Sequence, residues 1–176
     1  MIETLISSKT RIKLLLKFFL NSSNSSYLRG LESEFGESSN AIRLELNKFE
    51  NASLLTSTLK GNKKYFKANT KHPLFRDIHN ILLKFTGLDK IIDKVVNKLG
   101  DLERVYVIGR LAKGLDSEVV DLVFVGDIDR QYLFDLIEIA ESKLDKKIKY
   151  VLYASSELSE EAMEEMYDHH LLLWSK

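Results

Sequence analysis

Residues 107–129, with the sequence VIGRLAKGLDSEVVDLVFVGDID, carry the side chains of this chain that are best suited to phosphate chemistry. A β-branched run ends at Gly109, and a second run over residues 119–126 carries Asp121. A glycine turn lets backbone N–H groups approach a phosphate, and carboxylates on a strand can hold the Mg²⁺ ions that phosphoryl transfer uses. The segment therefore has the outline of a nucleotide-transferring site.

The carboxylates of this segment are too few for a two-metal site. Val119 stands where a second acid would share a strand face with Asp121, and strand alternation turns Glu118 to the opposite face. One carboxylate beside a valine is a poor start for the near-octahedral oxygen ligation of Mg²⁺. Asp127 and Asp129 follow the end of the strand, and Asp129 precedes a predicted helix, so we interpret it as an N-cap. We predict neither a metal nor a cofactor.

The glycine turn and the Asp-bearing strand resemble the minimal nucleotidyltransferase superfamily. Members carry Gly-Ser after the first strand, Asp-x-Asp on the next, and a third carboxylate on a later strand. Here Gly109 matches, and residues 112–114 are similar to the family's Ala-Arg/Lys-Gly. Arg110 replaces the serine, Val119 replaces the first aspartate, and the later run IKYVLY, residues 148–153, contains no carboxylate. The resemblance implies the family's fold, with Asp121 as a relic of its metal site.

A site without metal ions could still bind an anion. Gly109, Arg110 and Lys113 combine a glycine turn with two cations, which suits a small anionic effector or a nucleotide. Losing the carboxylates that order the metal ions should lower phosphoryl-transfer rates by many orders of magnitude. We therefore expect no catalytic residues and an inactive, sensor-like or partner-binding module.

The elements that would hold this segment run along residues 88–176. We expect a helix over 88–101, strands over 104–109, 119–126 and 148–153, and a closing strand in HHLLLWSK. A helix between the second and third strands carries the apolar stripe Leu133, Leu136, Ile137, Ala140 and Leu144, and an acidic helix over 155–168 would begin at Ser155 or Ser156. Strands alternating with helices predict an α/β sandwich.

The first half of the chain has a different pattern, with three short helices and a hairpin. The first helix would be capped by Ser7 or Ser8, the second would open at Ser25 or Ser26 and end at Gly36, and the third would be capped by Ser38 or Ser39. The third carries the buried stripe Ile42, Leu46 and Phe49. Gly61-Asn62 then separates two β-favouring runs, which indicates a two-residue hairpin. These elements describe a winged helix.

The polar face of the third helix is suited to reading DNA. Arg can fork onto guanine and Asn onto adenine in the major groove, and a helix N-terminus suits a phosphate. The candidate base-reading residues are Asn40, Arg43 and Asn47, the candidate phosphate ligands at the helix start are Ser38 and Ser39, and the candidate backbone contacts on the hairpin are Lys60, Lys63, Lys64 and Lys67. The alternative is a solvated polar face on a protein-binding winged helix.

The segment SSNAIRLELNKFENASLL…GNKKYFKANTKHPLF resembles the winged-helix domain of ArsR-type bacterial transcription regulators. The resemblance covers roughly residues 8–87 and implies a DNA-binding domain. Ser53 stands where that family usually has glycine between the recognition helix and the wing. The chain has no cysteine and no histidine cluster on these helices, so the metal-sensing branch of the family is not supported.

A connector helix over 72–87, beginning near Pro73, would join the two halves. Phe75, Ile78, Leu82 and Phe85 form its apolar stripe, which Leu74 and Ile81 widen. A stripe this wide indicates either a homodimer interface or packing against the second domain. His79 lies at the edge of the stripe, and we give it no functional role.

Charge separates the halves in the same way. Residues 1–87 contain 14 Lys and Arg against 7 Asp and Glu, whereas residues 88–176 contain 12 against 19. Opposed halves favour two modules, of which the first faces a polyanion. The chain has no long apolar run and no visible signal peptide, so we expect a cytoplasmic protein with no membrane partner.

These patterns predict an α+β protein of two domains: a winged helix-turn-helix with its connector over 1–87, and a nucleotidyltransferase-like α/β sandwich over 88–176. The expected function is transcriptional regulation by a homodimer bound to double-stranded DNA, with the second domain as a sensor or interaction module. Two alternatives remain open. One is an active Mg²⁺-dependent nucleotidyltransferase with a DNA-targeting domain, and the other is a non-enzymatic, antitoxin-like partner-binding protein.

Overall fold

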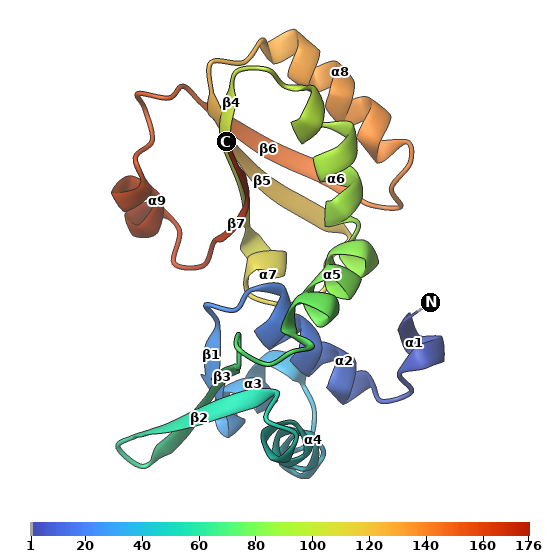
Figure 1. Ribbon diagram of the computed structural model, residues 1–176, viewed down its shortest axis with the longest axis vertical. Coiled ribbons are helices and arrows are strands. Elements are labelled where there is room, and N and C mark those ends of the chain that lie inside the picture. Colours follow the sequence, from blue (N-terminus) through green and yellow to red (C-terminus); the bar gives the residue numbers. More distant parts are fainter. Residues whose placement is uncertain (1) are drawn as a thin grey trace. The chain divides into compact units, whose positions relative to one another are not determined.

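The computed structural model describes residues 2–176, a mixed α and β structure with two separate sheets. The chain divides into two compact units, Met1–Phe85 and Thr86–Lys176 (Figure 1). Each unit has its own sheet, of three strands in the first and four in the second. No helix in the described residues is long and apolar enough to cross a membrane.

The first unit begins with α1 (Ile2–Leu5) and α2 (Lys9–Leu15), which continues into the π-helical segment η1 (Leu16–Leu20). The Ser8 hydroxyl accepts a hydrogen bond from the backbone N–H of Arg11, which confirms the predicted N-cap. The apolar side chains of α2 and η1 are buried: Ile12, Leu15, Leu16 and Leu20, with Phe18 and Phe19 fully enclosed. These residues form the centre of the first unit's core.

The next helix begins later than predicted. Residues Ser25–Tyr27 form strand β1, which pairs antiparallel with β3, and α3 (Leu28–Phe35) starts with Tyr27 as its N-cap residue. The prediction of a helix opening at Ser25 or Ser26 is therefore wrong, because these residues satisfy their backbone groups in a sheet with a partner forty residues away. Gly36 ends α3 with φ 63°, as predicted.

Helix α4 (Ser39–Asn51) follows after three residues. The Ser38 hydroxyl accepts from the N–H of Ala41 and is the N-cap, and Ile42, Leu46 and Phe49 are buried as predicted. The helix ends in a Schellman motif: the N–H of Leu54 donates to the carbonyl of Phe49, and Ser53 adopts φ 58°. A serine thus occupies a left-handed position that favours glycine.

The predicted hairpin is confirmed as β2 (Leu55–Lys60) and β3 (Lys63–Ala68), joined by Gly61 and Asn62. Gly61 has φ 60° at the first position of the turn, which glycine adopts without strain. Strand β3 is central in the order β1-β3-β2. The hairpin extends away from the helices of its unit (Figure 1).

The connector is α5 (Phe75–Thr86), three residues shorter at its start than predicted. The N–H of Leu74 donates to the His72 ring, and the N–H of Phe75 to the carbonyl of His72, so residues 72–74 form a turn. His79 has a structural role: its Nδ1–H donates to the carbonyl of Phe19 at 2.8 Å and its ring stacks on Phe75. This bond anchors α5 to η1.

The second unit is built on a sheet of order β6-β5-β4-β7. The strands are β4 (Leu102–Ile108), β5 (Val119–Gly126), β6 (Lys147–Tyr153) and β7 (Leu171–Ser175), so the predicted closing strand is confirmed. Only the β5–β6 pair is parallel among the pairs described. Helices α6 (Leu88–Lys94) and α8 (Arg130–Glu141) lie on one side of the sheet, and α9 (Glu160–Met166) lies on the other (Figure 1).

Two helix predictions in this unit need correction. The helix predicted over 88–101 ends at Lys94 and tightens into the 3-10 segment η2 (Val96–Lys98), which turns both Val95 and Val96 into the core. The acidic helix does not begin at Ser155 or Ser156. The Glu157 side chain and backbone close a turn on Ala154 there, and Ser159 caps α9 instead.

Candidate nucleic-acid interface

The polar face of α4 is oriented by an ion pair on the buried side of the helix. Glu45 accepts two hydrogen bonds from the Arg11 guanidinium of α2, at 2.8 and 3.2 Å, and one from Lys48 at 3.1 Å. The hydrogen bond from Arg11 is the main reason why the pKa of Glu45 lies below its usual value, although burial opposes it. This pair, together with the buried stripe, fixes the rotation of α4 about its own axis.

The opposite face of α4 is exposed. It carries Asn40, Arg43 and Asn47 within one sector of the helix, together with Leu44, whose side chain is 53% exposed. Because these residues are three or four positions apart, their side chains lie in one row. The three polar residues were predicted as site residues and Leu44 was not, although its position opposite the stripe Ile42, Leu46 and Phe49 accounts for its exposure.

At the start of α4 the two candidate serines differ. The Ser38 hydroxyl accepts the Ala41 N–H at 3.3 Å and therefore already serves the helix end. Ser39 is the first residue of the helix and is half-buried. Of the two serines, Ser38 is the N-cap of α4.

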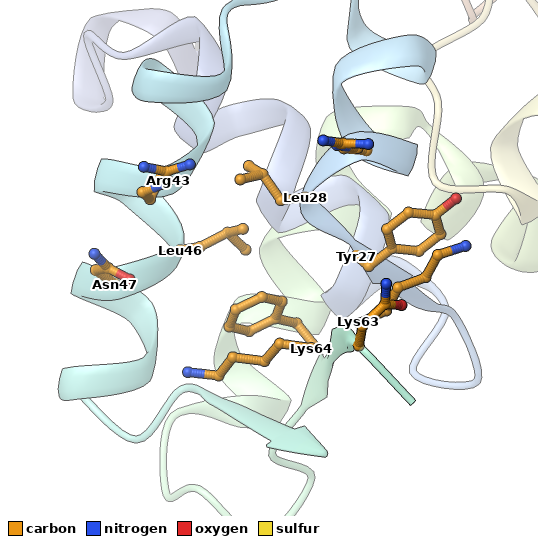
Figure 2. Close-up of a pocket in the computed structure, with 10 residues that line it drawn as sticks. Tyr27, Leu28, Arg43, Leu46, Asn47, Lys63 and Lys64 are labelled. Carbon is orange, nitrogen blue, oxygen red and sulfur yellow. The ribbon is translucent and has the colours of Figure 1, made fainter. Parts of the chain in front are cut away.

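A groove of about 480 Å³ lies between α4 and the beginning of β3 (Figure 2). Arg43 and Asn47 reach it from α4, Lys63 and Lys64 from β3, and Arg29 from the first turn of α3. Tyr27, Leu28, Leu46 and Phe66 form the apolar part of its wall. Among the described residues, the groove is thus lined by four cations and two amides, Asn47 and Asn62, and by no carboxylate, which is the chemistry expected around a polyanion.

Arg29, Tyr27 and Asn62 were not predicted as site residues. Arg29 stands alone in sequence, and only the return of β3 alongside β1 brings it near the hairpin. Tyr27 was assigned to the start of a helix, whereas it pairs with Tyr65 in the sheet, with ring centroids 5.2 Å apart. Asn62 was read as a turn residue only. No local signal in the sequence could have placed these three beside Arg43.

The four hairpin lysines do not share one surface. Strand alternation puts Lys63 and Lys67 on one face of β3 and Lys64 on the other, and Lys60 lies opposite Lys63 in the register. The Lys63 ammonium lies 4.4 Å from the centroid of the Tyr27 ring, and that of Lys60 lies 5.4 Å from the Tyr65 centroid. These cation–π contacts hold two ammonium groups over aromatic rings on the exposed face of the sheet.

Lys64 is the one groove lysine with an ion-pair partner among the described residues. Its ammonium group lies 2.7 Å from the Glu50 carboxylate at the end of α4, and Ser57 also donates to Glu50. The hydrogen bond from Lys64 is the first cause of a lowered Glu50 pKa. Glu50 therefore competes with any anion for Lys64.

In the second unit, Gly109 and Asp121 come together as the sequence suggested, but the two cations do not join them. Gly109 begins the short helix α7 (Gly109–Ala112) with φ 68°, and Asp121 Oδ2 lies 2.6 Å from where a β-carbon on Gly109 would stand. The Arg110 guanidinium instead lies 3.4 Å from the carbonyl oxygen of Asp116. Lys113 is exposed beyond the end of α7.

A second cavity of about 390 Å³ includes Arg110 but not Gly109, Lys113 or Asp121. Its lining contains the acids Asp116, Glu118 and Asp145, and Lys146 pairs with Asp116 at 3.2 Å. On the neighbouring strand, the residue in register with Asp121 is Lys149. Within residues 2–176, no group of three or more His, Cys, Asp or Glu side chains is arranged to hold a metal ion.

No protein-family model matches the chain, and no curated protein matches it. Several solved structures have partial likenesses to this chain. A proposed nucleotidyltransferase of Sulfolobus solfataricus is 21% identical, with a TM-score of 0.36, and the match covers 53% of this chain and 83% of that one. A tri-AMPylated Shewanella oneidensis HEPN toxin in complex with its MNT antitoxin gives 18% identity, a TM-score of 0.37, and coverages of 52% and 73%.

The third likeness is to a possible transcriptional regulator for arsenical resistance, with 20% identity, a TM-score of 0.31, and coverages of 51% and 88%. The neighbours thus include nucleotidyltransferase-like proteins and a regulator, and each match covers about half of the present chain. All three TM-scores lie below 0.5 and all three identities below 25%, so none of them establishes what this chain binds or catalyses.

Proposed function

We propose that the first unit is a winged-helix module that binds double-stranded DNA, with α4 as the recognition helix and the β2–β3 hairpin as the wing. The observation that carries this proposal is the groove between α4 and β3, which four cations and two amides line without a carboxylate. The exposed row Asn40, Arg43 and Asn47 continues from the groove along α4. A duplex could place base edges against this row and a phosphate strand in the groove.

Within this proposal the residues divide into two roles. Arg43, Asn40 and Asn47 contact base edges. Lys60, Lys63, Lys64, Lys67 and Arg29 contact the sugar–phosphate backbone, with Ser38 and Ser39 at the helix start. Leu44 adds an apolar contact for which a thymine methyl group is the natural partner. Base contacts would specify the sequence, and backbone contacts would supply most of the affinity.

We further propose that the chain binds DNA as a homodimer through α5. Leu74 and Ile81, seven residues apart, are 53% and 51% exposed, and the half-buried Ile78 and Phe85 extend the same stripe. A second copy would cover this stripe and present two recognition helices to a near-palindromic site. Sedimentation equilibrium tests this step: Ile81→Lys should give a monomer, and a dimer unchanged by that substitution would exclude α5 as the interface.

For the second unit we propose a non-catalytic role as a sensor or partner-binding module on a nucleotidyltransferase-like fold. Asp121 shares its strand face with Val119, and Lys149 stands in register beside it, so the neighbours that would complete a two-metal site are apolar or cationic. Gly109, Arg110 and Lys113 remain the candidate anion contacts, and Arg110 would have to leave the carbonyl of Asp116 to join Gly109. Calorimetry with a nucleoside triphosphate, with and without Mg²⁺, tests this: binding that requires Mg²⁺ and is lost in Asp121→Ala would favour an active enzyme instead.

The proposal as a whole is tested by selecting fragments of genomic DNA that the purified full chain retains. The expected result is enrichment of a short, near-palindromic motif, with binding that weakens steeply as salt rises. Recovery of random fragments, or of none while a second protein co-purifies in equal amount, would favour the antitoxin-like alternative.

A further inference from the structure

A third cavity, of about 450 Å³, lies at the base of the hairpin in the first unit, away from its turn. Lys67 and Thr56 line it from the paired ends of β3 and β2, Ser22 and Ser23 from the loop after η1, and Thr70 and Lys71 from the segment after β3. Four hydroxyl groups and two ammonium groups therefore meet in one depression, and no carboxylate of the described part of the chain lines it. We propose that this cavity binds a phosphoryl group.

The cations of this cavity are available to a ligand. Among the described residues, neither Lys67 nor Lys71 forms an ion pair with a carboxylate, and both side chains are exposed. The cavity that Arg110 lines differs in this respect, because its Lys146 is already paired with Asp116. The Thr56 hydroxyl donates to the carbonyl of Lys67 at 3.5 Å. The two ammonium groups, together with the hydroxyls of Ser22, Ser23 and Thr70, match the charge and the hydrogen-bonding capacity of a phosphate.

The backbone around the cavity is held by two asparagine turns. Asn21 Oδ1 accepts the N–H of Ser23 at 3.1 Å, and Asn69 Oδ1 accepts the N–H of Lys71 at 3.2 Å. Asn69 also donates through Nδ2 to the carbonyl of Ser53 at 2.8 Å. Because each turn is closed by an asparagine side chain, the backbone at Ser23 on one side and at Lys71 on the other is held in place before a ligand arrives.

The phosphoryl group could belong to a DNA strand or to a free phosphorylated molecule. Duplex phosphates beyond the wing would reach the cavity only if the proposed DNA binding is correct, whereas a free anion would bind in either case. Binding of a duplex phosphate therefore rests on the proposed function, whereas binding of a free phosphorylated molecule does not.

The first arm uses inorganic phosphate and the ¹⁵N-labelled full chain at constant ionic strength. Phosphate should shift the amide signals of Ser22, Ser23, Thr70 and Lys71 in a saturable way. Lys71→Met, which keeps the aliphatic stem, should raise the apparent Kd at least about fivefold, and the Ser22→Ala/Ser23→Ala double variant should raise it with no change in net charge. Lys84→Met on α5 has the same charge change outside the cavity and should leave the Kd unaltered.

The second arm measures DNA affinity against salt concentration for the same variants. Loss of one phosphate contact in Lys71→Met should reduce the slope of log K against log salt by about 0.9. A reduced slope identifies a duplex phosphate as the ligand, and an unchanged slope with intact phosphate-induced shifts identifies a free phosphorylated molecule. The inference is overturned if phosphate gives no localised shifts and the slope is unchanged, or if Lys71→Met and Lys84→Met behave alike in both arms.

Discussion

The Asp121 carboxylate occupies the space beside Gly109 that any other residue's side chain would need. Its Oδ2 lies 2.6 Å, and its Cγ 3.3 Å, from the position of a β-carbon on Gly109, whose φ is 68°. Gly109 is therefore required for packing against Asp121 on β5.

This contact predicts a coupling between the two residues. Gly109→Ala should lower the free energy of unfolding of the second unit by about 2 kcal/mol, partly from the left-handed φ and partly from the contact. In an Asp121→Ala background the contact is gone and only the backbone strain remains, so the loss should be smaller by at least about 0.5 kcal/mol.

Trp174 on β7 is the single tryptophan of the chain, so its fluorescence in urea reports unfolding of the second unit specifically. Additive losses in the double-mutant cycle would show that Asp121 does not press on Gly109. The loss in Gly109→Ala would then come from backbone strain alone.

Ser53 gives a second stability prediction, in the first unit. It holds the left-handed position of the Schellman motif that ends α4, with φ 58°. Ser53→Gly removes the strain of a β-carbon in that conformation and should raise the free energy of opening of α4 by about 0.5 to 1 kcal/mol, as measured by native-state hydrogen exchange. Ala52→Gly is the matched control. Residue 52 has φ −80°, so glycine there relieves nothing and should be destabilising.

The first unit shows which elements could be predicted from the sequence and which could not. The stripe Ile42, Leu46 and Phe49 with its serine cap predicted α4, and Gly61-Asn62 predicted the hairpin, because both signals are local. Strand β1 was missed because Ser25–Tyr27 take their conformation from β3, forty residues later. The same distant pairing brings Tyr27 and Arg29 to the groove.

The second unit shows the same difference between features set by local sequence and features set by the surrounding structure. Asp129 was predicted as an N-cap, and its carboxylate accepts the N–H of Tyr132 at 2.7 Å. The start of α9 was misplaced because three serines compete for the cap, and only the turn closed by Glu157 selects Ser159. The position of the Arg110 side chain could not be predicted from the sequence. It depends on the loop before β5, where the guanidinium reaches the carbonyl of Asp116.

Arg43 is the side chain on which the proposed base reading depends most. Arg43→Ala should weaken binding to the selected DNA motif by about 1 to 3 kcal/mol and relax the preference at one base pair. Arg76→Ala on α5 makes the same chemical change at an exposed site outside the groove and should have little effect. Competition binding with single-base variants of the motif measures both. An unchanged preference profile in Arg43→Ala would remove α4 from the recognition role.

Glu50 should lower the affinity of the first unit for DNA. Its carboxylate holds Lys64 at 2.7 Å, so a phosphate must compete with it. Glu50→Gln keeps the shape and removes the charge, which should raise affinity for DNA severalfold and steepen the salt slope by up to about 0.9. Glu32→Gln on α3 makes an equal charge change away from Lys64. Equal effects of the two substitutions would mean that only net charge matters and that Lys64 does not contact the duplex.

The Arg11–Glu45 pair predicts how the first unit responds to acid. Because the folded-state pKa of Glu45 is lowered, chiefly by the hydrogen bond from Arg11, its contribution to stability is present above the unfolded pKa, about 4.3, and is lost as the pH falls through the lower folded value. Glu45→Gln should lower the free energy of unfolding by about 1 to 2 kcal/mol at pH 7, since the guanidinium keeps only a neutral acceptor.

The same substitution should flatten the acid limb of the stability curve, so the difference between the wild type and Glu45→Gln should shrink between pH 5 and pH 3. Far-UV circular dichroism of thermal unfolding at a series of pH values measures it. Since Glu45 also fixes the rotation of α4, the variant should lose DNA affinity at pH 7 even though it removes a negative charge. A gain in affinity would mean that its charge matters and its anchoring of α4 does not.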